Sequence, residues 1–335
     1  MNIALCAGLS LPNLFARMPA AAAQGLVWGL MALGVYITFR LLDLADMTVD
    51  GSFATGGAVT VMLLLAGWPA WAALIAAALA GALAGLCTGL LHTRLGIPSI
   101  LSGILTQFAL YSINLRIMDM RANRTASVKN YGMFWEADSA GTGFLLSSRY
   151  IPQAILVGGI LVLLFIGLFY WFFGTEKGSA IRSTGSNPHM SRALGINIDT
   201  MKVLGLCLSN GMVALSGGLM TQFQGTADVN MGRGSIVIGL AAIIIGEVLC
   251  SALFRKGTNF AVTLGFVALG GVLYYGVMTV ILWLRLDPND LKLFTALIVA
   301  AFLAVPHLQE QRRSSFRMAG KKAKQEQQEE DRNHA

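Results

Sequence analysis

The chain has very little charge. Of its 335 residues, 12% are Asp, Glu, Lys or Arg, whereas an average soluble domain carries about 25%. This scarcity argues against an ordinary soluble domain with a charged surface. The mean hydropathy of +0.65 and the hydrophobic share of 55% instead indicate a protein that resides in lipid.

Side chains that could form a catalytic or metal site are also scarce. The chain has four dispersed cysteines and four widely separated histidines: Cys6, Cys87, Cys207, Cys250, His92, His189, His307 and His334. Their spacing predicts neither a disulfide framework nor a metal site. We therefore expect no catalytic residue, no metal ligand and no cofactor bound by this chain, which argues against an integral-membrane enzyme.

A loop for nucleotide phosphates is missing as well. The nearest stretch, 174-GTEKGSA-180, has the wrong spacing and lacks the Gly-Lys pair. If ATP drives this protein, another chain must hydrolyse it. The net charge of +7 could indicate a nucleic-acid partner, but most Lys and Arg residues lie in short loops and in the tail, as membrane orientation requires. We expect no nucleic-acid partner.

Apolar runs are abundant, and a bilayer needs about 20 residues for each helical span. Nine segments lie at roughly 22–40, 53–66, 70–91, 97–118, 152–173, 202–223, 236–250, 260–284 and 291–307. They predict an all-α, polytopic transmembrane helical bundle with eight to ten spans in a lipid bilayer. The short segments 53–66 and 236–250 predict broken or re-entrant helices.

This pattern divides the chain into an N-terminal segment 1–21, a transmembrane domain 22–307 and a polar tail 308–335. The tail has almost no apolar residue and charges of both signs, which predicts disorder on the cytoplasmic side.

Basic residues in alternate loops predict the orientation. One side receives Arg94, Lys177, Arg182, Arg192, Arg255, Lys256, Arg312, Arg313 and Arg317. The loop 119–150 is also basic, although alternation places it on the other side. We therefore follow the majority of the basic loops and assign their side to the cytoplasm.

An internal echo follows the first and the sixth segments. The stretches 45-ADMTVDGSFATG-56 and 227-ADVNMGRGSIVIG-239 share Ala-Asp, a Gly-Ser pair, and a Gly four residues after the Ser. Alternation places the two copies on opposite sides of the membrane, which predicts an inverted repeat of the kind found in transporters. Gly and Ala are abundant here, so a chance match stays open.

Polar side chains inside apolar runs are candidates for a solute pathway, because a charge at the bilayer centre costs roughly 2.5–3.5 kcal/mol. Gln107 and Asn114 are two helical turns apart and share one face. With Asn210, and with Asp50 and Ser52 at a broken helix, they form our predicted pathway. The alternative is that the amides only hold helices together.

Embedded acids leave a second class of transporter open. In a secondary transporter coupled to protons or sodium, the ion site would use Asp46, Asp50, Asp228 or Glu247. For Glu247 we favour an inner-surface ion pair with the basic loop that contains Arg255 and Lys256.

Three glycines, Gly81, Gly85 and Gly89, recur at four-residue spacing. Such a stripe predicts a close approach of another helix.

The stretch 185-GSNPHMSRALGINIDTMK-202 predicts a short, bounded helix over about 188–194 on the basic side. Asn187 can cap it, Pro188 suits its first position, and Gly195 can end it. An apolar face of Met190, Ala193 and Leu194 suits docking into a groove on another protein. A helix lying on the lipid interface is the alternative.

Together with 208-LSNGMVALSGGLMTQFQG-225, this stretch resembles the permease subunits of bacterial ABC importers in the branched-chain amino acid and ribose group. Three further stretches resemble a subgroup paired with binding proteins for tryptophan, tyrosine or related solutes: 43-DLADMTVDGSFATGGAV-59, 107-QFALYSINLRIM-118 and 287-DPNDLKLFTALIVA-300.

The resemblance implies that the short helix is a coupling helix seated in a cytoplasmic ATPase, which would use ATP and Mg²⁺. That helix would comprise Asn187, Pro188, His189, Met190, Ser191, Arg192, Ala193, Leu194 and Gly195. It also implies a homodimer of permeases in the bacterial inner membrane, with a solute-binding protein docking outside. The expected activity is import of a small solute, an amino acid being one candidate, by alternating access.

Overall fold

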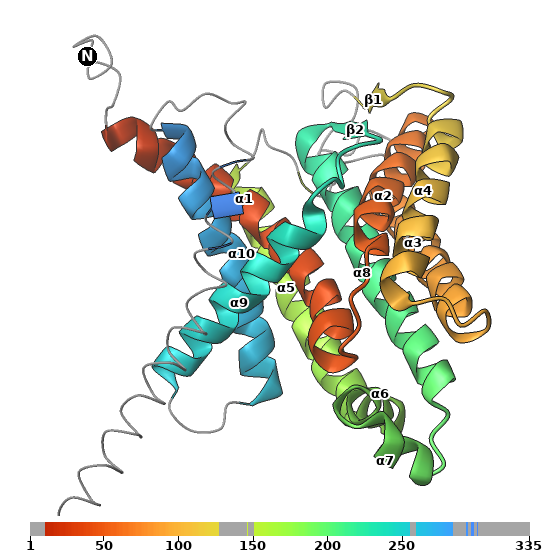
Figure 1. The fold of residues 1–335 in the computed structure, drawn as a ribbon. Helices are drawn as coiled ribbons and strands as arrows, with labels where there is room; N and C mark the ends of the chain where they lie inside the picture. Colours follow the sequence, from red (N-terminus) through yellow and green to blue (C-terminus); the bar gives the residue numbers. More distant parts are fainter. Residues whose placement is uncertain are drawn as a thin grey trace, which may run out of the picture. The chain divides into compact units, whose positions relative to one another are not determined.

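The computed structural model describes residues 11–126, 146, 151–254 and 259–283, and the single positions 293, 296, 297 and 300. All elements named here belong to the first of two compact units, Met1–Leu286. They are α1 (Leu11–Tyr36), the π-helical η2 (Ile37–Leu41), α2 (Thr48–Leu65), α3 (Ala70–Thr93), α4 (Ser99–Ile117), β1 (Asn123–Thr125), α5 (Ile151–Gly174), α6 (Glu176–Ser186), α7 (Pro188–Ala193), α8 (Ile198–Gln224), β2 (Thr226–Asp228), α9 (Ser235–Leu253) and α10 (Phe260–Trp283) (Figure 1).

Eight helices in the described part are long and apolar enough to cross a membrane. They match eight of the nine predicted segments, and the all-α membrane bundle is confirmed. The ninth segment, 291–307, lies almost wholly outside the described residues, as does the whole of the tail 308–335. The first helix begins at Leu11, so it extends into the predicted N-terminal segment and contains Pro19.

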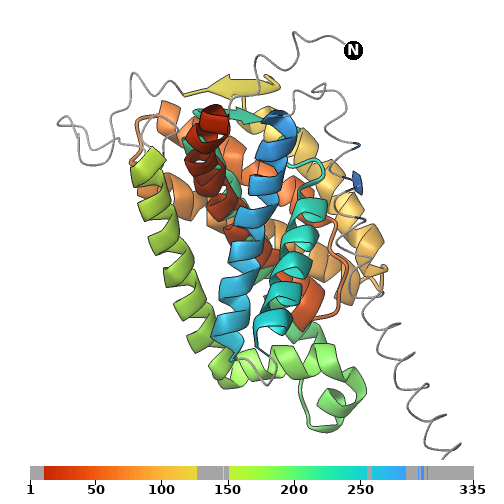
Figure 2. The same ribbon diagram turned by 90° about the vertical axis from the view of Figure 1, so that its left-hand side faces the viewer.

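The spans form two groups. In the first, α8 packs against α2 and α3, and α4 packs on α2. In the second, α1 packs against α10, α9 and α5, and α10 packs on α9. The contact of α1 with α8 joins the groups, and the two perpendicular views show the second group side by side (Figures 1 and 2).

The predicted glycine stripe lies where α3 meets α8. A Cβ atom on Gly81 would lie 2.3 Å from the Asn210 carbonyl oxygen, and one on Gly85 would lie 2.3 Å from that of Leu206. The two backbones are therefore in direct contact, and the predicted close approach is confirmed.

One end of the bundle carries the described basic residues that were assigned to the cytoplasm, which are Arg94, Lys177, Arg182 and Arg192. His92 Nε2 at the end of α3 lies 3.3 Å from Lys202 Nζ near the start of α8. The Arg182 guanidinium of α6 lies 5.8 Å from the ring centroid of Phe260, at the start of α10. These contacts place the α3–α4 connection, α6 and the start of α10 at the same end, as alternation predicts.

At the other end, β1 pairs antiparallel with β2. This pairing places the start of the basic 119–150 loop at the end opposite α6 and α7, again as alternation predicts. Arg124 in that segment forms an ion pair with Asp119.

Both short spans, α2 with 18 residues and α9 with 19, are unbroken helices. The irregular backbone lies in the segments that lead into them, residues 42–47 and 229–234. The depth of the segment before α2 follows from a contact with α3. The Thr48 and Thr88 hydroxyls lie 2.7 Å apart, and Thr88 is five residues, about 7.5 Å, from the end of α3. Irregular backbone at that depth requires cover by protein, and Leu42 and Asp46 are indeed buried.

Candidate functional site

The two copies of the echo form the same local turn. Asp46 Oδ1 accepts the N–H of Thr48 at 2.9 Å, and Asp228 Oδ1 accepts the N–H of Asn230 at 2.7 Å. Each turn precedes a short span. From there α2 runs toward the β1–β2 end, whereas α9 runs toward the α6–α7 end (Figure 1).

The copies meet inside the bundle. Asp50 of α2 accepts three hydrogen bonds at the start of α9: from the N–H of Gly234 at 2.9 Å, the Ser235 hydroxyl at 2.9 Å and the N–H of Ile236 at 3.0 Å. A carboxylate at a helix start satisfies free N–H groups and complements the helix dipole. The two copies thus enter the bundle from opposite ends, as alternation predicts, and they meet where Asp50 contacts the start of α9.

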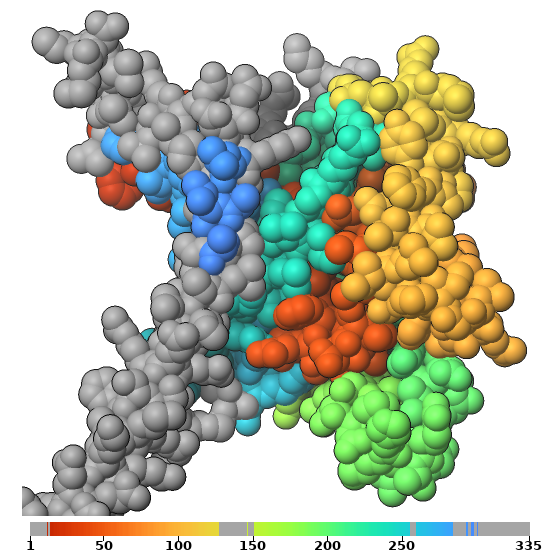
Figure 3. Space-filling model, in the orientation of Figure 1, coloured from red at the N-terminus to blue at the C-terminus, as the bar shows by residue number. Residues whose placement is uncertain are grey.

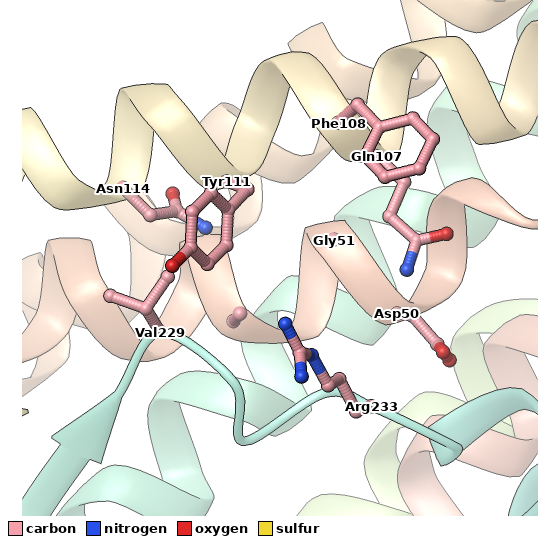
Figure 4. A pocket seen from close by; sticks show the side chains of 9 residues that line it. Asp50, Gly51, Gln107, Phe108, Tyr111, Asn114, Val229 and Arg233 are labelled. Atoms are coloured by element: carbon pink, nitrogen blue, oxygen red, sulfur yellow. The ribbon is translucent and has the colours of Figure 1, made fainter. Parts of the chain in front are cut away.

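A cavity of about 520 Å³ lies beside this junction (Figure 4). It is lined by α2, α4 and the segment before α9, and Figure 3 shows α2 lying between the other two. The lining residues are Asp50, Gly51, Ala54, Gln107, Phe108, Tyr111, Asn114, Val229 and Arg233. Three of the five predicted pathway residues, Asp50, Gln107 and Asn114, therefore line one pocket, and the two amides share a helix face as their spacing predicts.

Two lining residues have unused polar groups. Asn114 is 1% exposed, and its Oδ1 has no hydrogen-bond partner among the described residues. Asn114 Oδ1 therefore does not hold helices together. The Arg233 guanidinium makes no hydrogen bond or ion pair within the part of the chain that the structure describes. Arg233 was not among the predicted pathway residues, because its place in the pocket depends on the chain returning inward after β2.

The other two predicted pathway residues lie outside the pocket lining. Ser52 donates to Asn210 Oδ1 at 2.6 Å, and Asn210 Nδ2 donates to Asp46 Oδ2 at 2.7 Å and to the Leu206 carbonyl at 3.0 Å. All four atoms of the Ser52–Asn210–Asp46 connection belong to buried residues. This network attaches α2 and its entry segment to α8.

Toward the α6–α7 end, α4 makes a tight contact with the start of α2. A Cβ on Gly103 would lie 2.7 Å from the Met47 backbone nitrogen. Next to it, the Thr88 hydroxyl bonds to those of Thr48 and Thr106 at 2.7 and 2.9 Å.

Glu247, one of the acids considered for ion coupling, forms an ion pair with Arg40 of η2. Its two oxygens lie 2.7 and 2.8 Å from Nε and Nη2 of the guanidinium. The partners favoured from the sequence, Arg255 and Lys256, lie outside the described residues. Among the residues that the structure describes, there is no group of three or more His, Cys, Asp or Glu side chains placed to hold a metal.

The predicted short helix is present as α7. Asn187 Oδ1 accepts the N–H of Met190 at 3.0 Å, Pro188 occupies the first turn, and Gly195 has φ +80°. Met190 and Leu194 are 58% and 66% exposed, and Ala193 is exposed beside them. The bounded helix is confirmed, and no described residue covers its apolar face.

The remaining residues of the predicted coupling segment divide between surface and interior. His189 and Arg192 are exposed, whereas Ser191 is buried and donates to the Asn187 carbonyl at 3.0 Å. Helix α6, which precedes α7, was not predicted. A Cβ on its Gly185 would lie 1.9 Å from the Leu41 carbonyl oxygen of η2, so α6 connects α7 directly to the end of the first span.

Comparison with known proteins defines the class. Residues 18–306 match the family described as branched-chain amino acid transport system / permease component, and the chain belongs to this family. It is 37% identical to the tyrosine transport system permease protein of Clostridioides difficile over 85% of this chain and 90% of that protein. It is 24% identical to the ribose import permease protein RbsC of Haemophilus influenzae over 71% of each chain.

Among solved structures, PsaBC from Streptococcus pneumoniae in complex with Fab matches with TM-score 0.48 and 12% identity, over 88% of this chain and 95% of that one. Family and spans together define the membrane permease subunit of an ABC importer, a multi-pass inner-membrane protein. Such a subunit works with an ATPase and a solute-binding protein. Neither the family nor these relatives favour the ion-coupled alternative.

Proposed function

We propose that two copies of this chain form the pathway of an importer for an amino acid, and that α7 is the coupling helix on which the ATPase acts. ATP and Mg²⁺ are then bound by the ATPase, and this chain binds no cofactor. The name of the Clostridioides difficile relative supports an amino acid as the solute.

The observation that carries the proposal is the exposed apolar face of α7. A helix of six residues is too short to be stable alone in water, and here caps at both ends hold it. Burial of a Met or Leu side chain in a partner contributes about 1.5–3 kcal/mol, so Met190 and Leu194 suit a groove on a cytoplasmic protein.

The test is co-purification from the native host in mild detergent, with mass spectrometry of the associated chains. The unaltered permease should bring down an ATPase subunit. A variant with Met190→Asp and Leu194→Asp should lose about tenfold or more of it.

The control is Asn123→Asp, which adds a charge at the exposed, opposite end of the bundle and should retain the ATPase. Full retention of the ATPase by the α7 variant, or no ATPase with the unaltered chain, would contradict the proposal.

A further inference from the structure

The pocket receives one charge of each sign from the two copies of the echo. Asp50 directly precedes the Gly51-Ser52 pair, and Arg233 directly precedes the Gly234-Ser235 pair. The two side chains thus occupy equivalent positions in the repeat, and both line the cavity.

The two charged side chains differ in their hydrogen-bond partners. The Asp50 carboxylate already accepts three hydrogen bonds from the start of α9. The Arg233 guanidinium has no anion within the described residues, and Figure 4 shows it directed toward α4 and away from the Asp50 carboxylate. A guanidinium stays charged in proteins and matches a carboxylate with two parallel hydrogen bonds. Arg233 is an exposed residue of the pocket lining, so its guanidinium is available to an anionic group of a solute.

The pocket also offers hydrogen-bond acceptors. The Gln107 amide oxygen and a remaining lone pair on Asp50 belong to side chains of the lining. An ammonium group, which has three donors and no acceptor, would satisfy this side of the pocket.

The rest of the lining is apolar or aromatic. Phe108 and Tyr111 of α4 face the cavity together with Ala54 and Val229. Gln107 and Asn114 are seven residues apart, about 10 Å along α4, so the polar groups span a length that suits a small solute. The cavity of about 520 Å³ is within the usual range of small-molecule sites, about 300–1,000 Å³.

We propose that this pocket recognises a zwitterionic α-amino acid with an apolar or aromatic side chain. Arg233 binds the carboxylate; Asp50 and the Gln107 amide face the ammonium; Phe108 and Tyr111 contact the side chain. This inference rests on the proposed function and adds recognition by the permease itself. A neutral sugar would leave Arg233 without an anion.

The test measures binding to the permease–ATPase complex in lipid nanodiscs without the solute-binding protein, so that recognition comes from the membrane pocket. The probes are L-tyrosine, tyramine, which lacks the carboxylate, and 3-(4-hydroxyphenyl)propionate, which lacks the amine. L-tyrosine should bind most tightly. Arg233→Gln should weaken L-tyrosine and the propionate about tenfold or more and leave tyramine unchanged.

Two matched variants accompany it. Arg233→Lys keeps the charge but loses the paired geometry, so its affinity for L-tyrosine should fall between those of the native and Gln forms. Arg121→Gln removes an exposed arginine from the same end of the bundle, outside the pocket lining, and should bind L-tyrosine as the native complex does.

An unchanged affinity of Arg233→Gln for L-tyrosine would overturn the proposal, and so would an equal loss for tyramine. Failure of the native complex to bind any of L-tyrosine, L-phenylalanine and L-leucine would also overturn the pocket proposal. If the complex nevertheless imported an amino acid with ATP and the binding protein, the proposed function would stand. Loss of the ATPase from the native complex would instead count against the proposed function.

Discussion

At the scale of single residues, two aspartates one helical turn apart have different tasks. Asp46 is 3% exposed and lies in a network with Thr48 and Asn210 that attaches the entry of α2 to α8. Asp50 reaches across to the start of α9. Asp46 therefore holds helices of one group together, whereas Asp50 forms a direct hydrogen-bonded link between the two groups.

Replacing Asn210 with Leu should destabilise the protein by about 3 kcal/mol. The substitution removes the amide donor from the buried Asp46 side chain and the acceptor from Ser52, and each buried polar group left without a partner costs about 1–3 kcal/mol. Thermal unfolding of the detergent-solubilised protein measures the effect.

The control for Asn210→Leu is Thr200→Ala at an exposed position in the first turn of the same helix, which should unfold at the native temperature. Equal unfolding temperatures for all three proteins would show that the network contributes nothing to stability.

At this scale, part of the pocket lining could be predicted from the sequence. Spacing alone placed Gln107 and Asn114 on one face, because helical periodicity is local. It assigned Ser52 and Asn210 to the pathway, whereas the structure places both in a buried network outside the lining. Arg233 had one available signal, its position before the second Gly-Ser pair, which corresponds to that of Asp50.

At the scale of elements, the glycine contacts determine how closely the helices of the first group approach. Gly56 and Gly217 remove side chains where α2 crosses α8, and Gly81 and Gly85 do so where α3 crosses it. Because lipid offers no hydrophobic drive between helices, this packing is a principal source of cohesion.

Gly85→Ala should therefore destabilise the bundle by about 1–3 kcal/mol, because its Cβ would lie 2.3 Å from the Leu206 carbonyl oxygen, a backbone atom. Thermal unfolding in detergent is again the measurement. A loss no larger than that of the matched variant would contradict the packing argument.

The matched variant is Gly167→Ala in α5, where an added Cβ would meet no atom within 4 Å. Alanine favours a helix over glycine by about 1 kcal/mol, so this protein should be as stable as the native one or slightly more stable.

The spans could be predicted at this scale because twenty apolar residues leave few alternatives in a bilayer. Helix α7 could be predicted because its caps are local. Helix α6 could not, since Glu176–Ser186 contains two glycines and four Ser or Thr residues with little apolar periodicity. Packing against α8 and η2 holds α6 in place, and such contacts are not visible in the sequence.

At the scale of the whole molecule, a series of contacts connects the pocket with α7, the proposed coupling helix. Helix α7 follows α6, which lies against η2 and α8. Helix α8 carries Asn210, which fastens the start of α2 below the pocket. A pull on α7 by the ATPase would therefore act on the elements that line and adjoin the pocket.

The measurement that tests this account most directly is solute uptake into proteoliposomes containing the permease and its ATPase, with the solute-binding protein outside. L-tyrosine should accumulate only with ATP and Mg²⁺ enclosed, at a rate unaffected by a proton or sodium ionophore, and the variant with Met190→Asp and Leu194→Asp should abolish accumulation. Accumulation without ATP that collapses on adding an ionophore would contradict the account and would assign the embedded acids to ion coupling instead.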